Sequence, residues 1–299
     1  MSATPAVGWV FPGQGSQAVG MGRALAEADP AAAALFRAAD ETLGWPLSQA
    51  IFAGPAEQLQ QTDVQQPAIV VTSVAYWQAL ERRGQLPAPA CVAGHSLGQY
   101  SALVATGALA LPDALRLVAE RGRLMQRHGE GAMAAVLNLE AAAVAALAAE
   151  AGVEVANVNA PGQVTISGRR AAVEAAMALA QARGARRVVL LPVSAAFHSS
   201  LMQPVVDGLR PLVEAVPLAA PRAPVISNVD ARALTTPAEL RRELLDHICA
   251  PVQWVATIEA MLAAGVGEIV EIGPGRVLSG LVRRISRTVA LRDAEALLG

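Results

Sequence analysis

The chain has 299 residues, of which 54% are hydrophobic and only 3% aromatic, so its apolar mass comes mainly from alanine, valine and leucine. This composition is typical of an α/β or helical protein with one large core or two smaller ones. The formal net charge of −2 argues against a nucleic-acid-binding surface, and because all 23 basic residues are arginine, lysine-based Schiff-base chemistry is excluded.

Signals for a membrane, a leader peptide or a metal are missing from the sequence. No stretch approaches the roughly 20 apolar residues of a spanning helix, and residues 1–11 lack the charged and apolar regions of a secretory signal. The two cysteines, Cys91 and Cys249, do not make a disulfide framework, and the four histidines lack metal-ligand spacing. We therefore expect a cytoplasmic protein without a metal site.

Apolar strand and helix patterns alternate in the first part of the chain. Residues 7–11 predict a buried strand that ends in the glycine-rich loop 12–17, and residues 90–92 predict a second strand. Helical spacing at about 23–40 and 67–83 predicts crossover helices of a parallel sheet. Ligands of such sheets bind beyond the carboxyl ends of the strands, which is where loop 12–17 is expected.

Residues 94–98 read Gly-His-Ser-Leu-Gly between the second strand and a helix that stops at Gly107. The pattern G-x-S-x-G at a strand–turn–helix junction is typical of a nucleophile elbow. The glycines allow a tight turn, and the serine hydroxyl lies at the end of a helix, where backbone N–H groups can stabilise an oxyanion. The pattern indicates acyl transfer through an ester on Ser96.

A different order of elements runs from residue 129 to residue 195. The patterns there follow the order β-α-β-β-α-β, which is typical of a ferredoxin-like unit. We therefore predict an α/β fold with two domains. Residues 1–128 and 196–299 form a large, hydrolase-like domain with a mostly parallel sheet, and residues 129–195 form a small ferredoxin-like domain inserted into it.

Serine is a poor nucleophile unless a base takes its proton, and His198 is the best candidate for that base. It lies on a loop of small residues just after the last strand of the small domain, where it is free to face a cleft. His95 adjoins the serine around a sharp turn, so we expect it to support the elbow instead. No aspartate or glutamate is an obvious third member of a triad, and a carbonyl oxygen can orient the imidazole in its place.

Several separate segments resemble the malonyl-CoA:acyl carrier protein transacylases, a family of acyltransferases. They occur in the family's order and span nearly the whole chain. The segments are 11–17 (FPGQGSQ), 94–98 (GHSLG), 121–126 (RGRLMQ), 159–164 (NAPGQV), His198, 251–254 (PVQW) and 271–275 (EIGPG).

The resemblance implies a role for each matching residue. Ser96 would be the acylated nucleophile, and His198 would be its general base and acid. The backbone N–H groups of Gln14 and Leu97 would form the oxyanion hole. The main-chain carbonyl of Gln253 would orient His198, which would explain the missing acid.

Substrate choice is implied by two further positions. Arg121 would hold the free carboxylate of a malonyl group, because a guanidinium matches a carboxylate with two parallel hydrogen bonds. Phe197, which precedes the base, would favour malonyl over methylmalonyl, although a plain packing role explains it equally well. The sequence departs from the family at Gln99, where glutamate is usual, and this weakens any role for a charge at that site.

The implied reaction is ping-pong transfer. Malonyl-CoA acylates Ser96, CoA leaves, and the phosphopantetheine thiol of acyl carrier protein takes the malonyl group, with fatty acid biosynthesis as the favoured pathway. No cofactor is expected besides the substrate malonyl-CoA. Similar motifs serve polyketide assembly lines and malonate decarboxylase, so these pathways stay open.

Two other classes of function remain as alternatives. A serine esterase or thioesterase would use the same elbow without needing Arg121, and a non-catalytic module would only dock a carrier protein. We expect no nucleic acid or membrane partner, and a monomer. Carrier proteins are usually acidic, so arginines near the C-terminus are candidates for docking, although a solvated helix face explains them as well: Arg276, Arg283, Arg284 and Arg287.

Overall fold

The computed structural model describes residues 5–193 and 195–299. Its larger sheet has the strand order β10-β9-β1-β2-β7-β8, and neighbouring strands are parallel except for the pair β7 and β8. The predicted α/β fold with a mostly parallel sheet is confirmed. The strands are β1 (Ala6–Phe11), β2 (Pro89–Gly94), β7 (Val225–Ile226), β8 (Ala233–Leu234), β9 (Val266–Glu271) and β10 (Ala290–Asp293).

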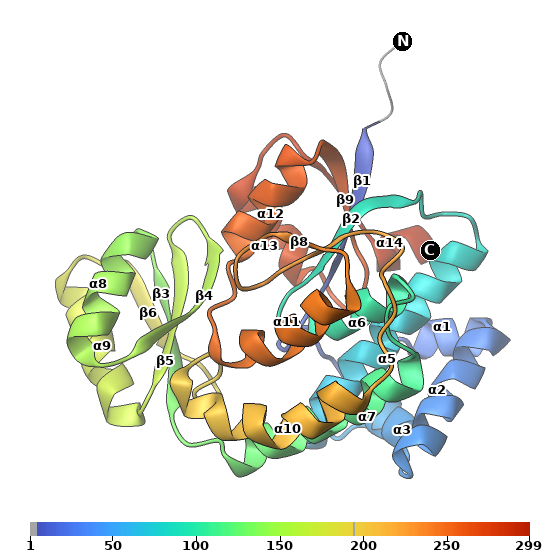
Figure 1. Cartoon of the computed structure of the whole chain (residues 1–299), viewed down its shortest axis with the longest axis horizontal. Coiled ribbons are helices and arrows are strands. Elements are labelled where there is room, and N and C mark those ends of the chain that lie inside the picture. The colour runs from blue at the N-terminus through green and yellow to red at the C-terminus, as the bar shows by residue number, and fades with distance from the viewer. Residues whose placement is uncertain (1–4, 194) are drawn as a thin grey trace.

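Helices cover both faces of this sheet (Figure 1). The longest described helix is α5, which lies almost entirely in the core. The helices outside the smaller sheet, together with a 3₁₀ turn, are α1 (Arg23–Ala28), α2 (Pro30–Leu43), α3 (Leu47–Ala53), α4 (Ala56–Leu59), α5 (Thr62–Arg82), α6 (Gly98–Ala105), α7 (Leu111–Arg127), η1 (Ser200–Met202), α10 (Gln203–Ala215), α11 (Pro237–Cys249), α12 (Trp254–Ala263), α13 (Val277–Ile285) and α14 (Ala294–Leu298).

Strand β1 lies between β9 and β2 and is buried on both faces. Its side chains alternate between two apolar clusters, with Trp9 and Phe11 in one and Val10 in the other. A strand that is covered on both faces reads as a continuous apolar run, which is why the sequence pattern of β1 is so clear. Phe11 pairs with Gly94 in the register of β1 and β2, so both strands end at the same edge. The loops that carry the candidate site therefore leave the sheet side by side.

The smaller sheet has the order β4-β5-β3-β6, and its neighbouring strands are antiparallel. Two helices pack on one of its faces, at the left of Figure 1, through a separate alanine-rich and valine-rich core. The elements are β3 (Ala132–Leu137), α8 (Ala141–Ala151), β4 (Glu154–Ala160), β5 (Gln163–Gly168), α9 (Arg170–Ala182) and β6 (Arg187–Leu190).

The edge strand β4 joins the smaller sheet to the rest of the molecule. The N–H of Val158 donates to the carbonyl of Val252 at 2.9 Å, and the N–H of Val252 donates to the carbonyl of Ala156 at 2.9 Å. These bonds seat β4 against the segment that leads into α12, as Figure 1 shows. No helix within residues 5–193 or 195–299 is both long and apolar enough to cross a membrane.

Candidate active site

The turn between β2 and α6 places Ser96 in a left-handed backbone conformation with φ of 50°. The flanking glycines are required by close backbone contacts. A Cβ on Gly94 would lie 1.9 Å from the carbonyl carbon of Gly98, and a Cβ on Gly98 would lie 2.1 Å from the carbonyl oxygen of Phe11. The geometry is that of a nucleophile elbow, in which backbone strain holds the serine hydroxyl at the apex of the turn.

His198 reaches the serine from the segment between β6 and η1. Its Nε2 lies 2.8 Å from the Oγ of Ser96, and both residues are buried. Its Nδ1 lies 2.8 Å from the carbonyl oxygen of His247 and 3.1 Å from that of Ala250. Because carbonyl oxygens only accept hydrogen bonds, Nδ1 carries the proton and Nε2 accepts the hydroxyl proton of the serine.

The electrostatic surroundings keep this imidazole neutral. Burial, and next the positive charge of Arg121, lower the pKa of His198 to about 3. A neutral imidazole has a free lone pair on Nε2, so at neutral pH the group is ready to remove a proton from Ser96.

The prediction that the carbonyl of Gln253 orients His198 is wrong in this structure. Gln253 directly precedes α12, and its carbonyl accepts the N–H of Thr257 at 2.8 Å within the first turn of that helix. The carbonyls of His247 and Ala250, at the C-terminal end of α11, hold the imidazole instead. A helix end leaves carbonyls without intrahelical partners, which makes them available to an imidazole N–H.

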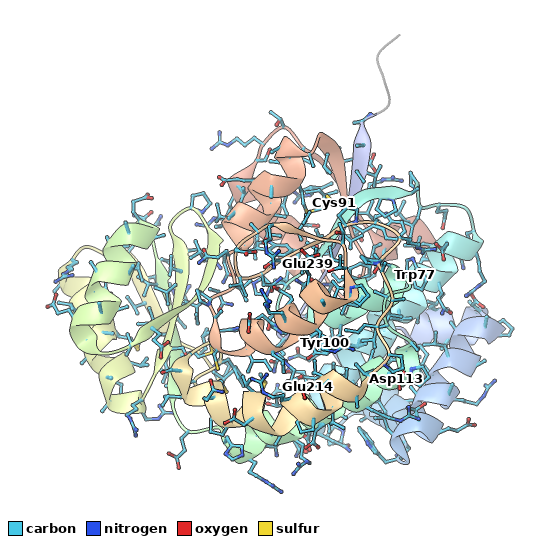
Figure 2. All side chains as sticks on the ribbon, in the orientation of Figure 1. Trp77, Cys91, Tyr100, Asp113, Glu214 and Glu239 are labelled. Atoms are coloured by element: carbon cyan, nitrogen blue, oxygen red, sulfur yellow. The ribbon has the colours of Figure 1, made fainter. Side chains whose placement is uncertain are left out.

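Arg121 lies on the buried face of α7, with apolar residues one turn before and after it. It is 1% exposed, its Nη1 donates to the Oε1 of Gln66 at 2.8 Å, and its Nη2 donates to the Oγ of Ser96 at 3.3 Å. Its carbon Cζ lies 5.9 Å from the ring centre of Tyr100, a fully buried residue that is labelled in Figure 2.

This guanidinium has no carboxylate partner among the described residues, and its Nε has no hydrogen bond there. A buried charge without a counter-ion is costly, and burial lowers the pKa of Arg121. A ligand carboxylate beside Ser96 would supply the missing charge.

Loop 12–17 packs directly against the elbow. A Cβ on Gly13 would lie 2.4 Å from the carbonyl oxygen of His95 and 3.7 Å from the backbone nitrogen of Leu97. The described hydrogen bonds do not use the backbone N–H of Gln14 or of Leu97, whereas the side chain of Gln14 donates to Gln65 at 2.6 Å. These two N–H groups are therefore free to act as the donors that an oxyanion needs.

Two other predicted residues lie near the site in different settings. Phe197 is 8% exposed and belongs to the main apolar cluster. The Nε2 of His95 lies 2.8 Å from the Oδ1 of Asn159 on β4, and its ring meets Trp254 edge-on, so His95 points away from the hydroxyl of Ser96. This position agrees with the supporting role expected for His95.

Sequence reasoning missed Asn228, which spans the elbow. Its Oδ1 accepts the N–H of Ser96 at 2.7 Å, and its Nδ2 donates to the carbonyl of Gly94 at 2.7 Å. Asn228 follows β7, whose carboxyl end lies at the same edge as that of β2. The signal that could have found it is the polar pair Ser227-Asn228 directly after a short apolar strand.

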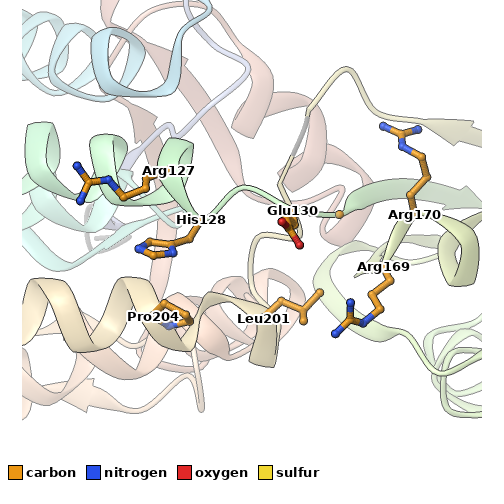
Figure 3. Close-up of a pocket in the computed structure, with 8 residues that line it drawn as sticks. Arg127, His128, Glu130, Arg169, Arg170, Leu201 and Pro204 are labelled. Atoms are coloured by element: carbon orange, nitrogen blue, oxygen red, sulfur yellow. The ribbon is translucent and has the colours of Figure 1, made fainter.

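A separate pocket of about 470 Å³ lies where α7 ends and α9 begins (Figure 3). Its lining does not include any of the predicted site residues. The lining residues are Arg127, His128, Glu130, Gly131, Arg169, Arg170, Leu201 and Pro204.

Comparisons with known proteins give a consistent result. Residues 8–299 match the model of the acyl transferase domain family. The chain is 44% identical over 302 residues to a malonyl CoA-acyl carrier protein transacylase of Bacillus subtilis, which covers 97% of the chain and 95% of the relative. It is 42% identical over 299 residues to the protein of the same name from Escherichia coli, with coverage of 97% and 96%.

Solved structures agree with these matches. An acyl carrier protein S-malonyltransferase from Vibrio cholerae superposes with a TM-score of 0.93 at 43% identity, over 96% of each chain. A malonyl-transacylase solved in complex with a type II PKS acyl-carrier protein superposes with a TM-score of 0.95 at 39% identity, over 98% of this chain and 97% of the other.

Proposed function

The chain belongs to the acyl transferase domain family, and we propose that it moves a malonyl group from malonyl-CoA to the phosphopantetheine thiol of an acyl carrier protein. It is an acyltransferase, and relatives of nearly equal length at 44% and 42% identity bear the name malonyl CoA-acyl carrier protein transacylase. The intermediate we propose is a malonyl ester on Ser96.

The first half-reaction acylates the serine. His198 Nε2 takes the proton of Ser96 Oγ as that oxygen attacks the thioester carbonyl of malonyl-CoA. The N–H groups of Gln14 and Leu97 would stabilise the oxyanion of the tetrahedral intermediate. As that intermediate collapses, the carbon–sulfur bond breaks, and the imidazolium gives its proton to the departing CoA thiolate.

The second half-reaction reverses these roles. The carrier thiol gives its proton to His198 and attacks the ester carbonyl, and the same donors stabilise the second tetrahedral intermediate. The ester carbon–oxygen bond then breaks, and the imidazolium returns a proton to Ser96. Both half-reactions use only the chain's own groups and the two thiol substrates.

The observation that carries the substrate assignment is the buried guanidinium of Arg121. It lies 3.3 Å from the Oγ of Ser96, and no described acid neutralises it. A malonyl group bound at Ser96 would bring its free carboxylate to this charge, whereas an acetyl group would leave the charge unpaired. A serine esterase or thioesterase that acts on apolar esters would be impaired by such a charge beside its nucleophile.

To test this, the protein is incubated separately with malonyl-, methylmalonyl- and acetyl-CoA, and the mass of the intact protein is measured after each incubation. We expect one malonyl group on Ser96, little methylmalonyl because of Phe197, and no accumulated acetyl group. A Ser96→Ala variant should gain no mass from any donor. Acetyl-enzyme at the level of malonyl-enzyme would overturn the assignment of the carboxylate site.

The pathway we favour is fatty acid biosynthesis. A second candidate is supply of a polyketide assembly line, since one similar structure is titled as a malonyl-transacylase in complex with a type II PKS acyl-carrier protein. The two are separated by offering a fatty acid carrier and a polyketide carrier in competition: the preferred carrier should be malonylated at least about tenfold faster.

The domain boundaries, the cellular location and the oligomeric state are also part of this proposal. The strand order β4-β5-β3-β6 with two helices supports a ferredoxin-like small domain, for which we propose residues 129–195, and residues 1–128 and 196–299 would form the large domain. The cytoplasmic location, the monomeric state and the absence of a cofactor stay predictions.

A further inference from the structure

Beneath the elbow lies a buried carboxylate that the proposed mechanism does not use. Glu243 on α11 is 6% exposed, and no described ion pair includes it. Three hydrogen-bond donors surround it instead: the N–H of Asn228 at 2.6 Å, the hydroxyl of Ser227 at 2.8 Å and the Nε2 of Gln99 at 3.1 Å. Burial raises the pKa of Glu243, and these three bonds oppose that effect. A buried group held by so many donors fixes the positions of those donors.

The most direct of these donors leads to the nucleophile. The backbone of Asn228 is fixed by Glu243 on one side and by the N–H of Gln253, which donates to its carbonyl at 2.8 Å, on the other. Its side chain then holds the N–H of Ser96 and the carbonyl of Gly94. Asn228 therefore makes two hydrogen bonds to a turn whose serine is in the left-handed region, one to Ser96 and one to Gly94.

The same helix also holds the base. His247 lies one turn after Glu243 on α11, and its carbonyl accepts from the Nδ1 of His198 at 2.8 Å. The ring of His247 is fixed in turn, because its Nδ1 donates to the carbonyl of Glu243 at 2.6 Å. One turn of α11 thus touches both reacting partners, the serine through Asn228 and the imidazole directly.

We propose that Glu243 is a positioning residue for acylation. By accepting the N–H of Asn228, it fixes the position of the elbow so that the hydroxyl of Ser96 lies within hydrogen-bond distance of the imidazole of His198, which α11 holds. This inference rests on the proposed function, since it concerns the reactivity of the same serine. Without an acceptor at position 243, the backbone of Asn228 keeps its bond from Gln253 but loses the bond that ties it to α11. A displacement of the order of 1 Å between nucleophile and base is enough to slow an enzymatic reaction by about 100-fold.

Two substitutions separate the acceptor from the rest of the side chain. Glu243→Gln keeps an oxygen for Asn228 and Gln99, and Glu243→Met keeps the length but has no strong acceptor. We expect the limiting rate of Ser96 acylation by malonyl-CoA to stay within about threefold for the glutamine variant and to fall about 30-fold or more for the methionine variant. The KM for malonyl-CoA should change less than the limiting rate, because the site around Arg121 is untouched.

A control variant on the same helix shows whether lost stability alone slows acylation. Leu240 is fully buried on α11 and makes none of these hydrogen bonds, so Leu240→Ala should lower the melting temperature while leaving the acylation rate unchanged below that temperature. A double-mutant cycle then tests the route of the effect. If Glu243 acts through Asn228, the double variant Asn228→Ala with Glu243→Met should be no slower than Asn228→Ala alone.

Reaction with a fluorophosphonate probe, which labels activated serines without needing a malonyl group, gives an independent readout. If the probe labels the wild-type protein faster than the Glu243→Met variant although neither protein forms a malonyl ester, the positioning role stands and the proposed function fails. A methionine variant that acylates and labels as fast as the wild type would overturn the positioning role. Additive rate losses in the cycle would also overturn it.

Discussion

At the level of single residues, the site combines a neutral imidazole with an unneutralised cation. Arg121 and His198 both lie within hydrogen-bond reach of the Ser96 hydroxyl, at 3.3 and 2.8 Å. The positive guanidinium is one cause of the low pKa of His198, so the imidazole remains unprotonated beside it. The arrangement favours a substrate that brings a negative charge to the guanidinium and a carbonyl to the serine.

Replacing Arg121 with alanine should reduce malonyl transfer much more than acetyl transfer. The change removes the partner of the malonyl carboxylate, and breaking a buried ion pair costs about 3–5 kcal/mol, which corresponds to about 100-fold or more in rate. The measurement is kcat/KM for malonyl-CoA and for acetyl-CoA. Arg123→Ala is a matched control, because Arg123 lies on the same helix but is exposed and paired with Glu120. An equal loss for both donors, with the fold intact, would contradict the assignment.

The low pKa of His198 predicts an unusual pH profile. A pKa of about 3 keeps the imidazole neutral throughout the range from pH 8 to pH 5, so kcat/KM for acylation should stay level as the pH falls across that range. An ordinary histidine base would lose activity around pH 6.5. A stopped-flow series with malonyl-CoA measures this, and an inflection between pH 6 and pH 7 would show that the imidazole is not held as the structure has it.

The side chains of the candidate site are easier to predict from the sequence than the backbone groups that contact them. A local pattern predicts Ser96, and a loop of small residues favours His198 as its base, whereas the role of Arg121 comes from the resemblance to a family. The carbonyls of His247 and Ala250 escaped because every residue has a carbonyl, and only the path of the chain decides which ones face an imidazole.

At the level of elements, the elbow requires the ends of β1 and β2 to lie in backbone contact with the start of α6, with no side chain between them. Gly98→Ala should destabilise the protein, because its Cβ would lie 2.1 Å from the carbonyl oxygen of Phe11 on β1 and the backbone must move. Overpacking of this kind costs about 1–3 kcal/mol, or roughly 2–4 °C of melting temperature per kcal/mol in a protein of about this size. Ser96 acylation should slow in parallel, because the same movement displaces loop 12–17.

Gly280→Ala is the matched control for this prediction. Gly280 lies inside α13, and a Cβ there would meet no atom within 4 Å. Alanine in a helix interior is favoured over glycine by about 0.5–1 kcal/mol, so thermal unfolding should occur at the same or a higher temperature. The account of the elbow would be contradicted if both variants melted and acylated like the wild type.

The helix patterns were right in kind and imprecise at their ends. The single helix expected at about 23–40 is divided into α1 and α2, because the carboxylate of Asp29 accepts the N–H of Ala31 and starts a new helix at Pro30. α5 begins at Thr62, five residues before the proline at which its start was expected. A proline fits without loss only in the first turn of a helix, but Pro67 is the sixth residue of α5 and lacks one intrahelical N–H donor. The burial of α5 outweighs this loss, so the proline does not mark the start of the helix.

At the level of the whole molecule, both sheets contribute to the site. His198 lies on the segment that returns from the smaller sheet, and Asn159 of β4 holds His95 of the elbow. Of the C-terminal arginines considered for carrier docking, Arg284 bonds to Gln163 and to the carbonyl of Pro161, so it links α13 to the smaller sheet. Arg276 is paired with Asp293.

The proposed function requires that Ser96 transfer its acyl group to a thiol. In the most direct measurement, the malonyl-enzyme is isolated and divided between buffer and a solution of carrier protein bearing phosphopantetheine. The masses of the intact enzyme and of the carrier are then followed over time. We expect the malonyl group to leave the enzyme and appear on the carrier, while the sample in buffer keeps its added mass much longer. Equal loss in both samples, with no mass gained by the carrier, would identify a hydrolase and contradict the account.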